Sequence, residues 1–62
     1  MYLVSVSSTA IRAIGYDGST LTVVFHNSGS YHHHGVPESV YLGLMNASSK
    51  GAYYNQYIRG RY

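Results

Sequence analysis

The pattern of the chain changes at Pro37, the only proline among 62 residues. A residue that precedes proline is pushed toward extended geometry, and proline fits well at the first position of a helix. The next residue, Glu38, is acidic, which the positive N-terminal end of a helix favours. The Val36-Pro37 step therefore predicts that strands end before it and that a helix begins at the proline.

The residues before this step predict three strands, at about 10–16, 20–26 and 30–34. The clearest signal is TLTVVF at 20–25, where apolar and polar side chains alternate and Phe25 shares one face with the apolar set. Asp17-Gly18 predicts the turn before this strand, and HNSGSY after it predicts a hairpin.

The register of that hairpin decides which side chains face the core. A three-residue loop at 27–29, with Gly29 in the left-handed conformation, places Phe25 opposite Tyr31. Tyr31 and His33 then face the core, and the histidines on either side of His33 face outward. A two-residue loop would exchange the two faces, because a slip by one residue reverses every side chain. We favour the three-residue loop because it brings Tyr31 against Phe25.

Two helices are predicted after the strands. Apolar side chains recur at helical spacing over 37–46 and form a stripe that faces a core. A second helix is predicted over 49–58, with Ser48 or Ser49 as its N-terminal cap and Gly60 at its end.

These elements predict an α+β fold: a three-stranded antiparallel meander followed by one or two C-terminal helices packed on one face. Residues 1–62 form a single domain, because the chain is too short for a second. The predicted core consists of Ile11, Ile14, Leu21, Val23, Phe25, Tyr31, Val40, Tyr41, Leu44, Tyr54 and Ile58.

Composition excludes several classes of protein. The chain has no cysteine, so disulfides and thiolate metal sites are excluded, as is common in a reducing cytosol. The opening stretch MYLVSVSSTAIR lacks the basic region of a signal peptide, and no stretch approaches the ~18 apolar residues of a membrane span. We expect a soluble, cytoplasmic protein with no membrane segment.

The histidines raise the question of a metal site. In the favoured register His32 and His34 share a strand face, and His26 lies diagonally across the hairpin. Zinc requires three or four ligands at about 2.0–2.1 Å and partners that orient the imidazoles. An open strand face provides no such enclosure, so we expect no metal and no cofactor. His33 is instead predicted to be a partly buried ring with one nitrogen hydrogen-bonded.

Catalysis is not expected either. The two carboxylates, Asp17 and Glu38, belong to a turn and a helix start, where each has an ordinary structural role. The chain contains no Gly-x-Ser-x-Gly motif, no phosphate loop and no paired acids. We predict a protein without catalytic residues.

Cations and tyrosines gather near the C-terminus. Phosphates need cationic donors and bases stack on exposed aromatic rings, so this combination predicts binding of RNA or a nucleotide. The alternative is a small interaction or inhibitor protein that acts through protein contacts or homo-oligomerisation, which low charge and many tyrosines favour. The candidate binding residues are Lys50, Tyr53, Tyr57, Arg59 and Arg61.

Four stretches of the chain together resemble the KTSC domain family. They are Ser7-Ser8 before IGYD (14–17), the alternating strand that ends at Phe25, GVP (35–37) followed by Val40-Tyr41, and SKGAYYN with IRGRY (49–62). The family is named for a domain at the C-terminus of some bacterial lysyl-tRNA synthetases and also occurs as small stand-alone proteins. The resemblance implies an intracellular protein, bacterial or phage-encoded, for which RNA binding is the role proposed from the synthetase context.

The resemblance departs from the family pattern at one place. The central family motif is similar to Tyr-x-Tyr before Gly-Val-Pro, and this chain reads Tyr31-His32-His33 there. His33 therefore replaces the second aromatic residue of the motif.

Overall fold

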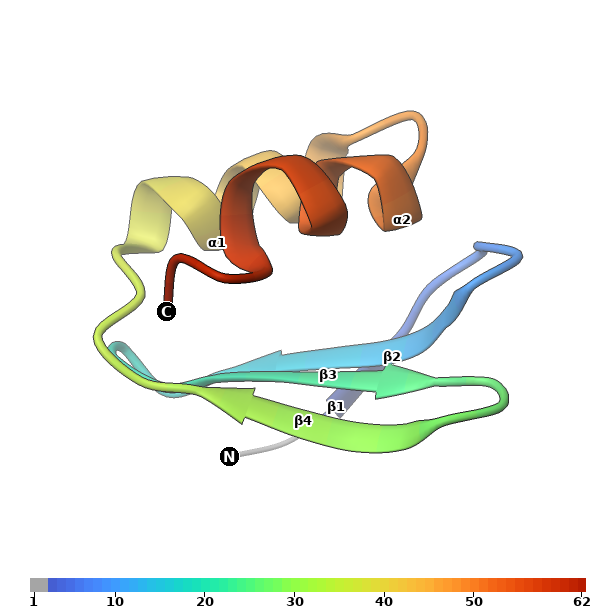
Figure 1. Ribbon diagram of the computed structural model, residues 1–62, viewed down its shortest axis with the longest axis horizontal. Helices are drawn as coiled ribbons and strands as arrows, with labels where there is room; N and C mark the ends of the chain where they lie inside the picture. The colour runs from blue at the N-terminus through green and yellow to red at the C-terminus, as the bar shows by residue number, and fades with distance from the viewer. Residues whose placement is uncertain (1–2) are drawn as a thin grey trace.

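A computed structural model describes residues 3–62, which form a four-stranded sheet covered by helices on one face (Figure 1). The predicted α+β class is confirmed. The predicted domain, 1–62, begins with two residues that lie outside the described part. In chain order the elements are β1 Leu3–Ser5, β2 Ile11–Tyr16, β3 Leu21–Phe25, β4 Gly29–His33, α1 Glu38–Asn46, α2 Lys50–Tyr53 and η1 Tyr54–Ile58, a π-helical turn that continues α2.

The sheet is antiparallel in the order β1-β2-β3-β4, with one strand more than the three predicted. The missed strand, β1, is only three residues long and pairs with β2, Leu3 lying opposite Gly15. Leu3 and Val4 remain 49% and 40% exposed, so β1 buries no apolar face. Strands are predicted from the alternation of apolar and polar residues, which arises when one face is buried. A strand with all its side chains exposed does not show this alternation and is missed.

The β3–β4 hairpin turns one residue earlier than predicted. Its loop is 26–28, and Gly29 begins β4 in the left-handed conformation, with φ +80°. Phe25 pairs with Gly29 and Val23 with Tyr31, a register two residues away from the predicted one. Because the difference is two residues, the faces are unchanged. Tyr31 still reaches Phe25 diagonally, with ring centroids 5.5 Å apart.

The core lies between the sheet and the helices. Of the predicted core residues, all except Tyr31 are buried or pack against the buried cluster. Tyr31 is 46% exposed because β4 forms the edge of the sheet. Val36 was not predicted, yet it is buried and its N–H donates to the Ser19 carbonyl at 2.9 Å. The fully buried side chains are Ile11, Ile14, Leu21, Val23, Val36, Leu44 and Ile58.

The helix α1 packs closely against the C-terminal helix at Gly43. It begins at Glu38, one residue later than predicted, because Pro37 is extended at the N-cap with ψ 153°. A side-chain carbon at Gly43 would clash with the hydroxyl group and the adjoining ring carbon of Tyr53. Glycine lowers helix stability by about 1 kcal/mol relative to alanine, but here it allows Tyr53 to pack over α1.

The second predicted helix, 49–58, has a regular start and an irregular end. The Ser49 hydroxyl accepts a hydrogen bond from the Ala52 N–H at 3.4 Å, which confirms one of the two predicted caps. At the other end the Arg59 N–H donates to the Tyr54 carbonyl at 2.8 Å. This bond spans five residues and defines a π-turn, which contains one residue more than an α-helical turn.

Within residues 3–62, no helix is both long enough and apolar enough to cross a membrane.

Candidate functional site

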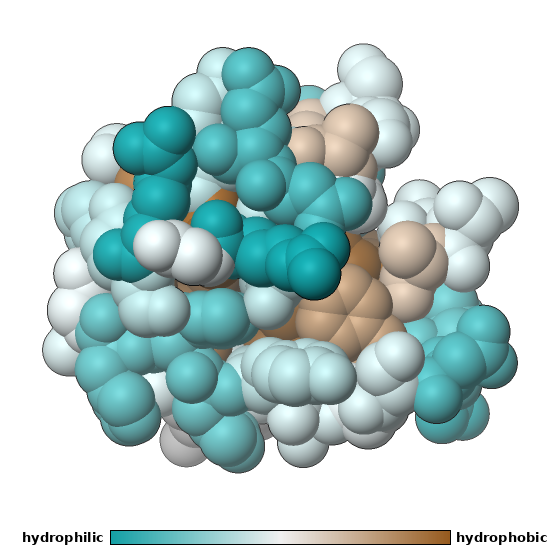
Figure 2. Space-filling model, in the orientation of Figure 1, coloured by the Kyte–Doolittle hydropathy of each residue, from teal (hydrophilic) through white to brown (hydrophobic). Residues whose placement is uncertain are grey.

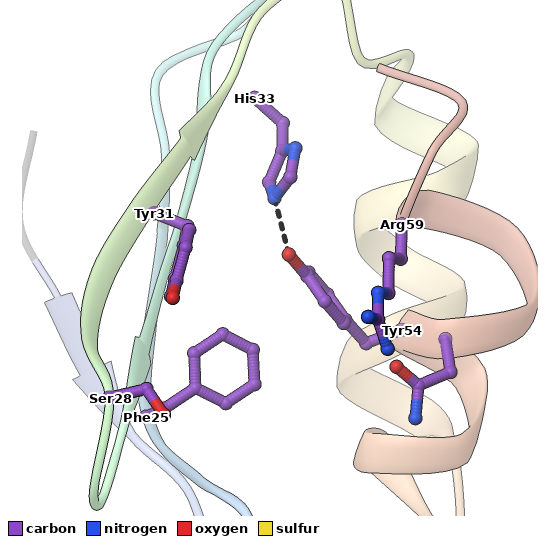
Figure 3. A pocket seen from close by; sticks show the side chains of 7 residues that line it. Phe25, Ser28, Tyr31, His33, Tyr54 and Arg59 are labelled. Carbon is purple, nitrogen blue, oxygen red and sulfur yellow. Dashed lines mark hydrogen bonds between the residues drawn. The ribbon is translucent and has the colours of Figure 1, made fainter.

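A cleft of about 450 Å³ opens between the β3–β4 hairpin and the C-terminal helix (Figure 3). Ligand sites in proteins usually measure about 300–1,000 Å³, so the cleft can hold a small ligand. Figure 2 shows hydrophobic surface between the helical layer and the sheet, with more hydrophilic atoms around it. We call this site the aromatic cleft: the hairpin contributes Phe25, Ser28, Tyr31 and His33, and the helix contributes Tyr54, Asn55 and Arg59.

Three aromatic rings line the aromatic cleft, two from the hairpin and one from the helix. Phe25 is half-buried and meets Tyr31 and Tyr54 edge-to-face, with centroid distances of 5.5 and 5.1 Å. Such pairs favour a fixed relative orientation of the rings. Tyr31 is 46% exposed, so part of its ring remains available to a ligand.

His33 and Tyr54 connect the two sides of the cleft. The Nε2 atom of His33 lies 2.7 Å from the Tyr54 hydroxyl, as the dashed line in Figure 3 shows. Burial raises the pKa of Tyr54, and the charge of Arg59 partly opposes this. The Tyr54 hydroxyl therefore stays neutral at physiological pH. His33 is half-buried, as predicted, but both of its ring nitrogens have hydrogen-bond partners where one was predicted, because Nδ1 also lies 3.4 Å from the Tyr62 carbonyl.

The π-turn brings Arg59 to the cleft. Because the turn closes on a bond from the Arg59 N–H to Tyr54, Arg59 returns to the side of the helix that carries Tyr54. The Arg59 side chain is exposed and lines the cleft. Within residues 3–62, its guanidinium forms no ion pair, with Asp17, Glu38 or any other group, so it is available to an external anion.

Lys50 lies at the other end of the same helix, in a separate cleft. It is nine positions before Arg59, or about 13 Å at 1.5 Å per residue. Its Nζ donates to the Ala47 carbonyl at 3.1 Å. This second site, the hydroxyl cleft, measures about 410 Å³ and is lined by Ser7, Ser8, Thr9, Ser48, Ser49, Lys50 and Gly51.

The structure does not gather the other predicted binding residues into either cleft. Tyr53 is half-buried over α1, and Tyr57 is 44% exposed with its ring 4.6 Å from that of Tyr53. Arg61 is exposed, and its Nε donates to the Gln56 carbonyl at 3.3 Å. Of the five predicted residues, Arg59 alone lines the aromatic cleft.

Sequence reasoning missed the aromatic partners of Arg59. It assigned Phe25, Tyr31 and Tyr54 to the core. The spacing of aromatic residues in the sequence shows that they face inward, but it does not distinguish a ring buried in the core from one that lines a cleft. One signal did exist in the sequence. The last strand of a meander lies at the edge of its sheet, so its inward side chains border the open side of the core.

The consecutive histidines are divided between two faces of the sheet. His33 points to the cleft, and its neighbours bond to threonine hydroxyls on the other face. The contacts are His32 Nδ1 with Thr22 Oγ1 (2.9 Å), His34 Nδ1 with Thr20 Oγ1 (3.0 Å), and His26 Nε2 with the Ser8 carbonyl (3.0 Å). Within residues 3–62, no three histidine or acidic side chains are grouped as metal ligands.

Comparison with known proteins identifies the family. Residues 7–62 match the KTSC domain, and the chain belongs to this family. The crystal structure of a KTSC domain protein from Yersinia pestis has the same fold, with a TM-score of 0.94 and 37% identity, over 97% of this chain and 87% of that one.

Two further relatives differ greatly in length. The chain is 34% identical over 62 residues to a lysine–tRNA ligase of Nostoc punctiforme, a match that covers 97% of this chain but only 11% of the ligase. It is also 33% identical over 61 residues to an uncharacterized protein of Stutzerimonas stutzeri, covering 95% of this chain and 86% of that protein. The domain therefore corresponds to a small segment of the ligase and to most of the shorter relative.

Proposed function

We propose that this KTSC domain is a non-enzymatic binding module for RNA or a nucleotide, and that Arg59 in the aromatic cleft contacts a phosphate. The observation that carries the proposal is that one cleft holds an exposed tyrosine and a guanidinium that pairs with no carboxylate in the described residues, 3–62. Arginine binds phosphate through paired hydrogen bonds, and aromatic rings stack on bases. The similarity to a segment of a lysine–tRNA ligase also supports a nucleic-acid partner.

The groups in the cleft support binding rather than catalysis. His33 is the histidine that lines the cleft, and its Nε2 lies 2.7 Å from the Tyr54 hydroxyl while its Nδ1 lies 3.4 Å from the Tyr62 carbonyl. Neither Asp17 nor Glu38 lines the cleft. Because both ring nitrogens of His33 are occupied by groups of the protein, the contacts favour a structural role for this ring over that of a general base.

Charge reversal tests the proposal. Affinity for a short single-stranded RNA is measured against salt concentration for the wild type, Arg59→Glu and Lys50→Glu. Each phosphate contact contributes about 0.7 to the salt slope of a single strand. We expect Arg59→Glu to reduce the slope by about this amount and Lys50→Glu to leave it unchanged. Arg59 is exposed, so the fold should persist in the variant.

Two results would contradict the proposal. The first is no binding of RNA oligomers or nucleotides by the wild type at low salt. The second is equal binding by the wild type and Arg59→Glu at every salt concentration.

Exposed apolar side chains favour a second function, contact with another protein or another copy of this chain. Leu42 on α1 and Tyr57 on η1 are 47% and 44% exposed. Aromatic and aliphatic side chains supply much of the binding energy at protein interfaces. Sedimentation of the wild type and of Leu42→Ser would test this. A monomer at every concentration would exclude self-association.

A further inference from the structure

The dimensions of the aromatic cleft restrict what can enter it. Its volume of about 450 Å³ lies near the lower end of the range for ligand sites. Side chains of the hairpin and of the helix face one another across it (Figure 3). A flat ring system can insert edge first, whereas a base within a duplex is covered on both faces by its neighbours.

Tyr31 provides a surface on which a flat ring can stack. Tyr31 is 46% exposed, and its ring packs edge-to-face against Phe25, which in turn packs against Tyr54. A platform that is already ordered loses little side-chain entropy when a ligand binds. Stacking of one base on an aromatic side chain changes affinity by about 5- to 150-fold.

Charge in the cleft is limited to one cation. Arg59 is the single lysine or arginine among the lining residues, so the cleft can neutralise one phosphate. Binding that depends on one phosphate has a salt slope of only about 0.7. The aromatic surface must therefore supply most of the affinity, in contrast to proteins that bind a duplex through many phosphates.

Two polar side chains complete the lining. Ser28 lies on the hairpin side and Asn55 on the helix side. Within residues 3–62, neither side chain forms a hydrogen bond to another group of the protein. A hydroxyl and an amide offer both donors and acceptors, which suit the edge of an unpaired base.

We infer that the aromatic cleft holds one unpaired base, stacked on Tyr31 with its phosphate on Arg59. This inference rests on the proposed function and names its ligand class: a nucleotide unit of single-stranded RNA, or a free nucleotide, rather than duplex RNA.

The test compares ligands and variants of the full, untagged chain. The ligands are a short single-stranded RNA, the same strand annealed to its complement, adenosine 5′-monophosphate, and ribose 5-phosphate, which has no base. The variants are Tyr31→Ala and Tyr57→Ala. The two tyrosines are a matched pair, 46% and 44% exposed, and only Tyr31 lines the cleft.

We expect single-stranded RNA to bind more tightly than the duplex, and the nucleotide more tightly than ribose 5-phosphate. Tyr31→Ala should weaken binding of single-stranded RNA by about 5- to 150-fold, and Tyr57→Ala by less than about 2-fold. Circular dichroism checks that each variant is folded. If Tyr31→Ala is unfolded, Tyr31→Leu keeps an apolar side chain but removes the flat ring, and it should show the same loss.

Two results would overturn the inference, and they are distinguishable. If the duplex binds as tightly as the single strand and loss of the Tyr31 ring has no effect, the base-stacking inference is wrong while the proposed RNA binding stands. If none of the RNA and nucleotide ligands binds, the inference and the proposed function both fail.

Discussion

The two ends of the C-terminal helix each carry a cation, but the cations have different surroundings. Arg59 lies beside exposed aromatic surface and pairs with no carboxylate within residues 3–62. Lys50 lies among hydroxyl groups and already donates to the Ala47 carbonyl. A cation near apolar rings can combine phosphate binding with stacking, whereas a cation among hydroxyls offers polar contacts alone. The two cations therefore differ in the contacts that they could offer to a ligand.

The backbone at the two ends explains this difference. Ser49 caps the first turn and satisfies one of its free N–H groups. The last turn is a π-turn, and its extra residue brings Arg59 back over Tyr54. The first turn is therefore capped by a side chain of its own helix, whereas the last turn places the Arg59 side chain at the aromatic cleft.

The largest expected effect comes from Phe25→Ala, which removes one of the three rings that line the aromatic cleft beside Arg59. Truncation of phenylalanine in a core costs about 3–5 kcal/mol, and we expect about 3 kcal/mol because Phe25 is half-buried. Lys50→Ala at the other end should cost under about 1 kcal/mol, the worth of one hydrogen bond. Urea denaturation measures both. Equal free energies of unfolding for Phe25→Ala and Lys50→Ala would show that the packing around Arg59 contributes no more to stability than the hydrogen bond of Lys50.

A smaller effect is expected from Ser49→Ala, which removes the cap at the Lys50 end. Loss of a serine cap costs about 1 kcal/mol. Ser48→Ala is the control, because Ser48 is exposed and Ser49 provides the cap. RNA affinity should change in neither variant, because both positions border only the hydroxyl cleft. Weaker RNA binding by Ser49→Ala would indicate that the two ends are coupled.

The smallest effect is expected from Asp17→Asn, in the turn between β2 and β3. The Asp17 carboxylate accepts hydrogen bonds from the Thr20 and Ser19 N–H groups at 2.7 and 3.1 Å. These bonds lower its pKa below the ordinary value of 3.8. A lowered pKa in the folded state stabilises the protein above the unfolded pKa, and this contribution is lost as pH falls through the folded value.

Thermal unfolding at several pH values measures this effect. Asp17→Asn should be slightly less stable than the wild type near neutral pH, and the difference should disappear in strong acid. Because Asp17 lies outside both clefts, the difference should be the same in Arg59→Ala and Lys50→Ala backgrounds. If the effect of Asp17→Asn changed in either background, Asp17 would be energetically coupled to Arg59 or to Lys50.

The elements that were predicted correctly from the sequence are those in which one face of a strand or helix is buried in the core. Alternation over 20–25 and the proline at 37 located β3 and the start of α1 within one residue, because both signals arise from burial or from backbone geometry. The strand at Leu3–Ser5 was missed because its side chains are all exposed. The hairpin register differed by two residues because either pairing buries the same side chains.

The candidate site was only partly predictable. Arg59 was identified from its charge and its position near tyrosines, but two of the aromatic rings in its cleft, Phe25 and Tyr31, come from a hairpin about 30 residues earlier in the chain. A pattern of local spacing cannot show which distant strand packs against the end of a helix. Lys50 was grouped with Arg59 because they are close in sequence, yet a helix separates them in space.

The strand order β1-β2-β3-β4 also has a consequence for the rate and order of folding. Each strand pairs with its neighbour in the chain through a loop of three to five residues, 6–10, 17–20 or 26–28. Short loops close at low entropic cost, and predominantly local contacts favour fast folding. The hydrogen bond between His33 and Tyr54 spans 21 residues and forms only when the C-terminal helix docks on the hairpin. The aromatic cleft is therefore expected to form last, as folding is completed.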